Sequence, residues 1–230
     1  MQLNENILRN PLRGLGYGAD DILSVGAFGA VAARAGVGKT SFLVQIALNA
    51  MLRNKRVLHI SLEHPVKKVN LWYQDVFQHL SEYHGLKNTH PLWEAILPFR
   101  FIMTLQVDGF SVPRLVERLK DLTEQGIFKP DMIIIDGLPF DGTARGILAE
   151  LKPIAEDGMS VWFTVRTHRH EAPAPDGLPA QLTNIKDFFE VIIALQPEGG
   201  DILVRNLKGG NGIAESVVRL NPSSMLIQTG

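Results

Sequence analysis

The sequence predicts an α/β fold in which helices flank a mainly parallel, twisted sheet with an antiparallel C-terminal edge. Short apolar runs that are typical of strands alternate with longer segments of amphipathic, helical periodicity. The strand runs are apolar throughout, as in parallel strands that are buried on both faces. The last three strand runs follow one another without helical segments between them, which indicates an antiparallel meander at the sheet edge.

The expected elements follow from apolar spacing and from helix start and stop signals. The strands are expected at 22–32, 57–62, 100–106, 132–135, 161–165, 189–195, 202–205 and 214–220. The helices are expected at 39–53, 65–83, 113–125 and 144–156. Pro65 suits a first helical turn, Gly126 a helix end, and Pro153 a kink. A single domain is expected over 1–230, with its core at about 12–220.

Composition excludes several classes of protein. Of the 230 residues, 45% are hydrophobic, so the chain has enough apolar side chains for a core and is not disordered. A net charge of −1 argues against a surface that binds polyanions everywhere, although it leaves a local basic patch open. The absence of Cys excludes disulfides, thiolate zinc sites and thiol catalysis. Without a long apolar run or a signal-peptide pattern, a cytoplasmic protein with no membrane partner is expected.

The strongest functional signal is a glycine-rich segment between an expected strand and an expected helix. Glycines allow backbone N–H groups to converge on an anion, and the helix N-terminus adds a favourable dipole. Lys39 is expected to reach the β- and γ-phosphates, and Thr40 to ligate Mg²⁺. Ala33 replaces the glycine that usually opens such a motif, and the alternative is a glycine-rich turn with a chance lysine. The expected phosphate-binding residues are Ala33, Arg34, Ala35, Gly36, Val37, Gly38, Lys39, Thr40 and Ser41.

Two carboxylates at strand ends complete the expected site. Asp136 follows an apolar strand and is expected to hold Mg²⁺ through water at the carboxyl edge of the parallel sheet, with a plain turn residue as the alternative. Glu63 ends the strand after the glycine-rich segment, and we expect the strand beside it to carry that segment or to adjoin it. This placement favours Glu63 as a general base or water-orienting residue. The alternative is that Glu63 caps the following helix.

These elements together resemble the RecA-like P-loop ATPase core, and most closely the DnaB-type helicase and KaiC-type ATPase domains. The segment A-R-A-G-V-G-K-T is similar to the A-R-x-x-x-G-K-T form of DnaB-type enzymes, and S-L-E at 61–63 matches their catalytic-base element. The resemblance implies ATP and Mg²⁺ as cofactors, ATPase activity and a homo-oligomer, of which a hexameric ring is one form. It also places Arg166 at the end of a sensor strand that contacts nucleotide. It covers about 12–220 and includes neither an N-terminal helical domain nor a second ATPase repeat.

The segment N-L-K-G-G-N-G at 206–212 is similar to the K-x-R-N-G element of these helicases. There, the Lys and Arg reach the γ-phosphate held by the neighbouring subunit, as an arginine finger does. Lys208 matches the Lys and is therefore a catalytic candidate, but Gly210 stands where the Arg is expected. Arg205 is an alternative cation, and the alternative for Lys208 is a solvated hairpin lysine.

Three functions remain open from the sequence. The favoured one is a slowly hydrolysing ATPase that acts as a regulatory or assembly switch, with a protein partner. The second is a nucleic-acid motor or loader, which is less favoured because the loops 137–145 and 166–183 carry few cations. The third is a nucleotide-binding scaffold without turnover, and a phosphotransferase also stays open. The sequence does not distinguish ATP from another nucleoside triphosphate.

Two further groups of residues have less specific patterns. His168, His170 and Glu171 suggest either a metal site or, more simply, a solvated polar loop. Trp72, Tyr73 and Phe77 lie on an expected helix, where core packing is favoured over a stacking platform for bases.

Overall fold

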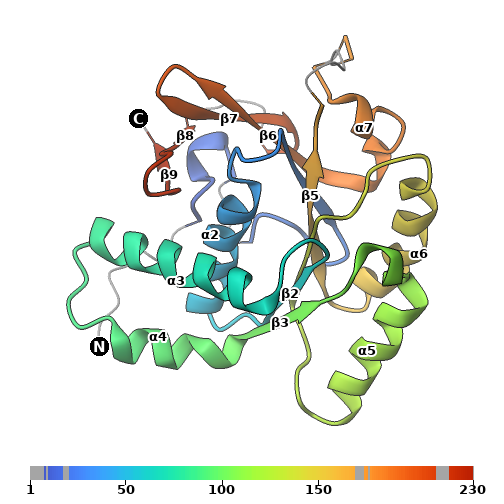
Figure 1. Cartoon of the computed structure of the whole chain (residues 1–230), viewed down its shortest axis with the longest axis horizontal. Coiled ribbons are helices and arrows are strands. Elements are labelled where there is room, and N and C mark those ends of the chain that lie inside the picture. Colours follow the sequence, from blue (N-terminus) through green and yellow to red (C-terminus); the bar gives the residue numbers. More distant parts are fainter. Residues whose placement is uncertain are drawn as a thin grey trace.

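The computed structural model describes residues 8, 10–17, 21–168, 174–175, 177–210 and 218–229, which build one nine-stranded sheet with helices on both faces (Figure 1). The strand order is β3-β2-β4-β5-β1-β6-β7-β8-β9. The strands that pair in parallel are β1 (Phe28–Ala33), β2 (Val57–Ser61), β3 (Arg100–Thr104), β4 (Met132–Asp136), β5 (Ser160–Arg166) and β6 (Phe189–Glu198). The antiparallel edge consists of β7 (Asp201–Lys208), β8 (Val218–Leu220) and β9 (Ile227–Thr229).

Helices cover both faces of the sheet because its strands are apolar on both sides. The face with α2 (Lys39–Leu52), α3 (Val66–Tyr83) and α4 (His90–Ile96) is opposite the face with α5 (Val112–Glu124), α6 (Ala144–Glu156) and α7 (Ala180–Thr183) (Figure 1). Neighbouring residues of one strand enter different cores: Trp162 packs on the α2 side and Phe163 on the α5 and α6 side. Short 3₁₀ helices lie at Arg13–Leu15, Leu97–Phe99, Val107–Gly109 and Lys186–Phe188.

The predicted α/β architecture, with its parallel centre and antiparallel C-terminal edge, is confirmed. Helix α6 has the predicted bounds and contains Pro153. The first strand was predicted too early, because residues 22–27 form turns and β1 begins at Phe28. The described part of the last predicted strand is β8, Val218–Leu220, and residues 214–217 lie outside the described part of the chain. The short elements α4, α7 and β9 were not predicted, since they are too brief to show a period.

The carboxyl ends of the parallel strands meet at one edge of the sheet. Register places Ser61 of β2 beside Asp136 of β4, and Ala33 of β1 beside Arg166 of β5. The loops that leave β1, β2, β4 and β5 therefore converge there, which is where open α/β sheets hold their ligands. Among the described residues, no helix combines the length and the apolarity needed to cross a bilayer.

Candidate functional site

The loop at residues 34–38 joins β1 to the N-terminus of α2. Gly38, the residue preceding α2, has φ of 106°, a left-handed conformation that glycine adopts without strain. A Cβ at this position would also lie 3.1 Å from Sδ of Met225. No side-chain hydrogen bond from the described residues caps α2, so the backbone N–H groups of its first turn have no side-chain partner. An uncapped helix N-terminus of this kind can bind an anion.

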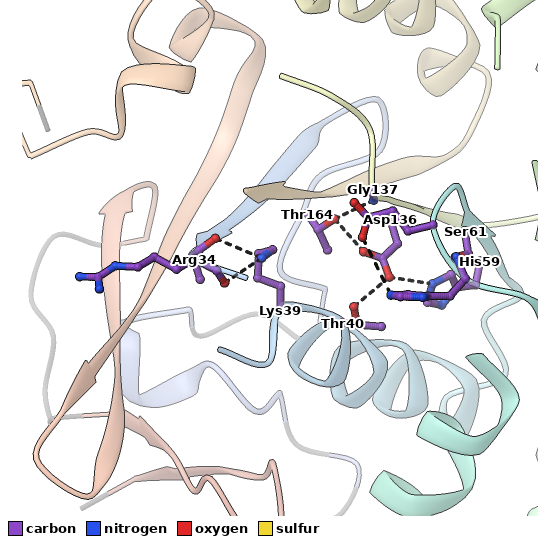
Figure 2. A network of polar contacts seen from close by, with 11 residues as sticks. Arg34, Lys39, Thr40, His59, Ser61, Asp136, Gly137 and Thr164 are labelled. Atoms are coloured by element: carbon purple, nitrogen blue, oxygen red, sulfur yellow. Dashed lines mark hydrogen bonds and ion pairs between the residues drawn. The ribbon is translucent and has the colours of Figure 1, made fainter. Parts of the chain in front are cut away.

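Lys39 is folded back onto this loop. Its Nζ donates hydrogen bonds to the carbonyl oxygens of Ala33 and Arg34, each at 3.1 Å (Figure 2). The pKa of Lys39 lies below its ordinary value because burial lowers it, an effect that Asp136 and Glu63 oppose and Arg166 reinforces. Figure 2 shows the side chain of Arg34 extending away from Lys39, so Arg34 contributes its backbone carbonyl to this network.

Asp136 is the centre of a buried polar cluster, with only 6% of its surface exposed. The hydroxyl of Thr40 donates to Oδ2 at 2.9 Å, and the hydroxyl of Thr164 donates to Oδ1 at 2.7 Å (Figure 2). Gly137 N–H donates to the Thr164 hydroxyl at 2.9 Å, which orients that hydroxyl toward Asp136. Burial acts to raise the pKa of Asp136, but His59, Thr164 and Thr40 together bring it below its ordinary value.

Thr40 and Asp136 offer the donor atoms that a magnesium ion prefers. Both present oxygen, and Mg²⁺ is usually held by one or two protein oxygens together with substrate phosphates and water. The two residues therefore fit a Mg²⁺ ion that is shared with a phosphate group. In the described residues there is no group of three or more His, Cys, Asp or Glu side chains that would hold a metal without such a phosphate.

His59 is a site residue that sequence reasoning missed. It is fully buried on β2, with Nε2 3.8 Å from Oδ2 of Asp136 and Nδ1 3.2 Å from the hydroxyl of Tyr73. The ring of Tyr73 lies under the guanidinium of Arg100 at 4.6 Å. The sequence did contain a sign of this role, because His59 is the one ionisable residue in the mostly apolar run V-L-H-I-S-L. Its meaning depends on β2 pairing with β4, which the sequence did not reveal.

Glu63 lies at the site, but the strand order that brings it there differs from the predicted one. We expected the strand beside β2 to carry the glycine-rich loop or to adjoin its strand, and this is wrong, since β4 and β5 lie between β2 and β1. Glu63 nevertheless lines the same cavity as Lys39, because the loops after β2 and β4 meet. No side chain caps α3, so the alternative role of Glu63 as a helix cap is not observed.

The backbone at Gly137 leaves room for Glu63. Gly137 follows Asp136 with φ of +93°, and a Cβ there would lie 2.7 Å from Cγ of Glu63. The carboxylate of Glu63 is half-exposed, with His64 Nε2 at 3.9 Å. Glu63 is therefore a solvated carboxylate beside a buried one, an arrangement in which Asp136 suits ion binding and Glu63 suits contact with water.

These residues line one cavity of about 740 Å³ at the carboxyl edge of the sheet. This size is in the range of small-molecule and cofactor sites. The glycine-rich loop and α2 form one side, and the loops after β2, β4 and β5 form the other. The predicted site residues that line it are Ala35, Gly36, Gly38, Lys39, Thr40, Ser41, Glu63, Asp136 and Arg166.

Four predicted residues lie elsewhere. Lys208 ends β7, does not line this cavity, and donates from Nζ to the carbonyl oxygen of Lys186 at 2.7 Å. Ala33 and Arg34 line a second cavity, on the side of β6. Val37 is buried in the core below the loop, where it anchors the loop rather than faces a ligand.

Of the two less specific groups, the aromatic one is largely core, as favoured. Tyr73 and Phe77 are buried, whereas Trp72 is half-buried and lines the cavity with Lys68 Nζ 5.3 Å from its ring centre. His168 also lines the cavity, but His170 and Glu171 lie outside the described residues, as do positions 211–212 of the predicted K-x-R-N-G-like element.

No protein-family model matches this sequence, and no curated protein is significantly similar to it.

Proposed function

We propose that this chain binds a nucleoside triphosphate, ATP in the first instance, and hydrolyses it slowly in the manner of a RecA-like P-loop ATPase. One observation carries the proposal. Thr40 begins the helix that follows β1, and Asp136 ends β4, which is two positions from β1 in the sheet; the Thr40 hydroxyl and Oδ2 of Asp136 are 2.9 Å apart in a cavity that Lys39 and Glu63 also line. A lysine, a hydroxyl and two carboxylates beside an anion-binding turn are the parts that phosphoryl transfer requires.

The phosphate groups fit the turn at 34–38, because the first residues of α2 line the cavity and no side chain caps their N–H groups. Lys39 exchanges its hydrogen bonds to two backbone carbonyls for bonds to phosphate oxygens, which are anionic and therefore stronger acceptors. Thr40 and Asp136 would hold Mg²⁺, and Thr164 fixes the orientation of Asp136. When bound, Mg²⁺ would supply positive charge that offsets the negative charge of the phosphate groups.

Glu63 acts on the attacking water. It accepts a proton as the water oxygen bonds to the γ-phosphorus, while the bond from that phosphorus to the bridging β–γ oxygen breaks. The products are a nucleoside diphosphate and inorganic phosphate, and Glu63 returns its proton to solvent through its exposed side. Lys208 is not one of the residues that act here, because its Nζ donates to the carbonyl oxygen of Lys186 outside the cavity.

We further propose that the nucleotide state serves as a regulatory or assembly switch in an oligomer. The net charge of −1 and the small number of cations at the cavity edge support this role over that of a nucleic-acid motor, since nonspecific nucleic-acid binding requires several phosphate contacts.

The test is a MgATP hydrolysis assay on the purified chain, with and without single-stranded DNA and RNA at low salt. Lys39→Ala and Glu63→Gln are each expected to lower turnover about 100-fold or more. The matched controls are Lys87→Ala and Glu94→Gln, which change exposed residues outside the cavity. Turnover that survives Lys39→Ala would contradict nucleotide hydrolysis at this site. Strong stimulation of hydrolysis by single-stranded DNA or RNA would contradict the regulatory switch and support a nucleic-acid motor.

A further inference from the structure

Arg166 brings a second cation into the cavity from within the same chain. It is the last residue of β5, paired with Ala33, and the N–H of Thr167 donates to the carbonyl oxygen of Ala33 at 3.0 Å. Alternate residues of a strand share a face, so Arg166 projects on the same side as Thr164, which contacts Asp136. Arg166 is exposed and lines the cavity together with Lys39, Glu63 and Asp136.

The guanidinium of Arg166 is available to a ligand. No described residue forms a hydrogen bond or an ion pair with it, although the carboxylates of Asp136 and Glu63 line the same cavity. Burial is the main cause that lowers the pKa of Lys39. The carboxylates of Asp136 and Glu63 act to raise it, and the charge of Arg166 lowers it further. The two cations therefore face one space, in which a polyanion would relieve their mutual repulsion.

The cation that the helicase-like element would deliver from a neighbouring subunit is held elsewhere. Lys208 is bonded to the carbonyl oxygen of Lys186, beside the ion pair of Arg145 with Asp187 at 3.0 Å. Gly210 has φ of +71°, and a Cβ there would lie 3.0 Å from Nδ2 of Asn206 and 3.1 Å from the carbonyl oxygen of Leu15. An Arg at this position would be strained, so the conformation of the turn disfavours the Arg that the helicase element has there.

We propose that Arg166 is a catalytic residue that stabilises the transferring γ-phosphoryl group in cis, in place of a cation supplied by a neighbouring subunit. This proposal rests on the proposed function. A guanidinium presents a planar fork of N–H donors that matches two phosphoryl oxygens. Its charge acts most where negative charge develops in the transition state. Hydrolysis by each chain is therefore independent of contacts with its neighbours, and assembly follows the nucleotide state instead of creating the active site.

The first experiment separates ground-state binding from transition-state stabilisation. Wild type, Arg166→Ala, Arg166→Lys and the exposed-residue control Arg118→Ala are compared for MgATP turnover, for MgADP affinity, and for capture of MgADP with aluminium fluoride. Arg166→Ala is expected to lose about 100-fold or more in turnover and to lose the aluminium fluoride complex. Its MgADP affinity is expected to stay within a few-fold of wild type, and Arg166→Lys to recover part of the turnover. Unchanged turnover, or an equally large loss in Lys208→Ala, would overturn the proposal.

The second experiment distinguishes action in cis from action in trans. Arg166→Ala is mixed with Glu63→Gln, so that each chain carries one defect. If Arg166 acts in cis, the mixture shows the average of the two low activities. An activity well above that average means that Arg166 crosses to a neighbour, and the proposal is then wrong. If wild type neither binds MgADP nor hydrolyses MgATP, the proposed function itself fails, and this outcome is distinct from binding and turnover that do not depend on Arg166.

Discussion

The hydroxyl of Thr40 lies 2.9 Å from Oδ2 of Asp136, although 96 residues separate them along the chain. The contact exists because β5 is the only strand between β1 and β4, so the helix that follows β1 reaches the end of β4. Asp136 also accepts a hydrogen bond from Thr164, and Nε2 of the fully buried His59 lies 3.8 Å from its Oδ2. The carboxylate is thus positioned before any ligand arrives, and each contact around it can be tested separately.

The contact between Tyr73 and His59 stabilises the floor of the site. Tyr73→Phe removes the hydroxyl that lies 3.2 Å from Nδ1 of the buried His59. We expect the free energy of unfolding to fall by about 1 kcal/mol, because a buried hydrogen-bond partner is lost. Urea unfolding measures this, with the exposed Tyr83→Phe as the control. In the background of His59→Ala the effect of Tyr73→Phe should disappear, and an unchanged effect there would show that the two side chains are not coupled.

Asp136 gives the stability of the protein a specific pH dependence. Its folded-state pKa is below the ordinary value, so its ionised form stabilises the fold. That contribution is complete above the unfolded-state pKa of about 4 and is lost as the pH falls through the lower, folded-state value. Urea unfolding of wild type should therefore show a steeper loss of stability below about pH 4 than Asp136→Asn. Equal pH slopes in the two proteins, with Asp75→Asn as an exposed control, would argue against this role.

The glycine after Asp136 links backbone geometry to the candidate base. Gly137→Ala places a Cβ 2.7 Å from Cγ of Glu63 at φ of +93°, so we expect a displaced Glu63, reduced MgATP turnover and a stability loss of about 1–2 kcal/mol. Gly158→Ala is the matched control, because its φ is +95° and no atom lies within 4 Å of the new Cβ. The control should lose similar stability and keep full turnover. If both variants turn over MgATP equally well, Gly137 does not position Glu63.

The turn at Gly210 should reject the arginine that the helicase-like element would place there. Gly210→Arg introduces backbone strain at a positive φ and also close contacts with Asn206 and Leu15. Gly199→Arg introduces the backbone strain alone, because φ is +62° there and the space around the Cβ is open. We expect Gly210→Arg to be less stable than Gly199→Arg by about 1 kcal/mol or more in thermal or urea unfolding. Equal stabilities would mean that the turn tolerates the larger side chain.

Elements with a clear period or a specific local motif were predictable from the sequence. Helix α6 was placed with its observed limits, and the glycine-rich segment was placed between a strand and a helix, as observed. The short elements α4 and β9 were missed, because a few residues do not establish a period. Residues 22–27 are apolar enough to resemble a strand, yet they form turns before β1.

Sheet order was the main property that the sequence did not reveal. Glu63 was expected near the glycine-rich loop because of an assumed neighbouring strand, but it reaches the cavity through the loops after β2 and β4. His59 looked like a single polar residue in a buried strand, and only the pairing of β2 with β4 brings it to Asp136. Both depend on long-range pairing, which local patterns do not encode.

The most direct test of the central claim is a calorimetric titration of MgATP into wild type and into Lys39→Ala, with circular dichroism to verify that both are folded. We expect saturable binding to one site per chain in wild type, weaker binding without Mg²⁺, and loss of binding in folded Lys39→Ala. Undetectable binding of any nucleoside triphosphate by folded wild type, or equal affinity in Lys39→Ala, would contradict it.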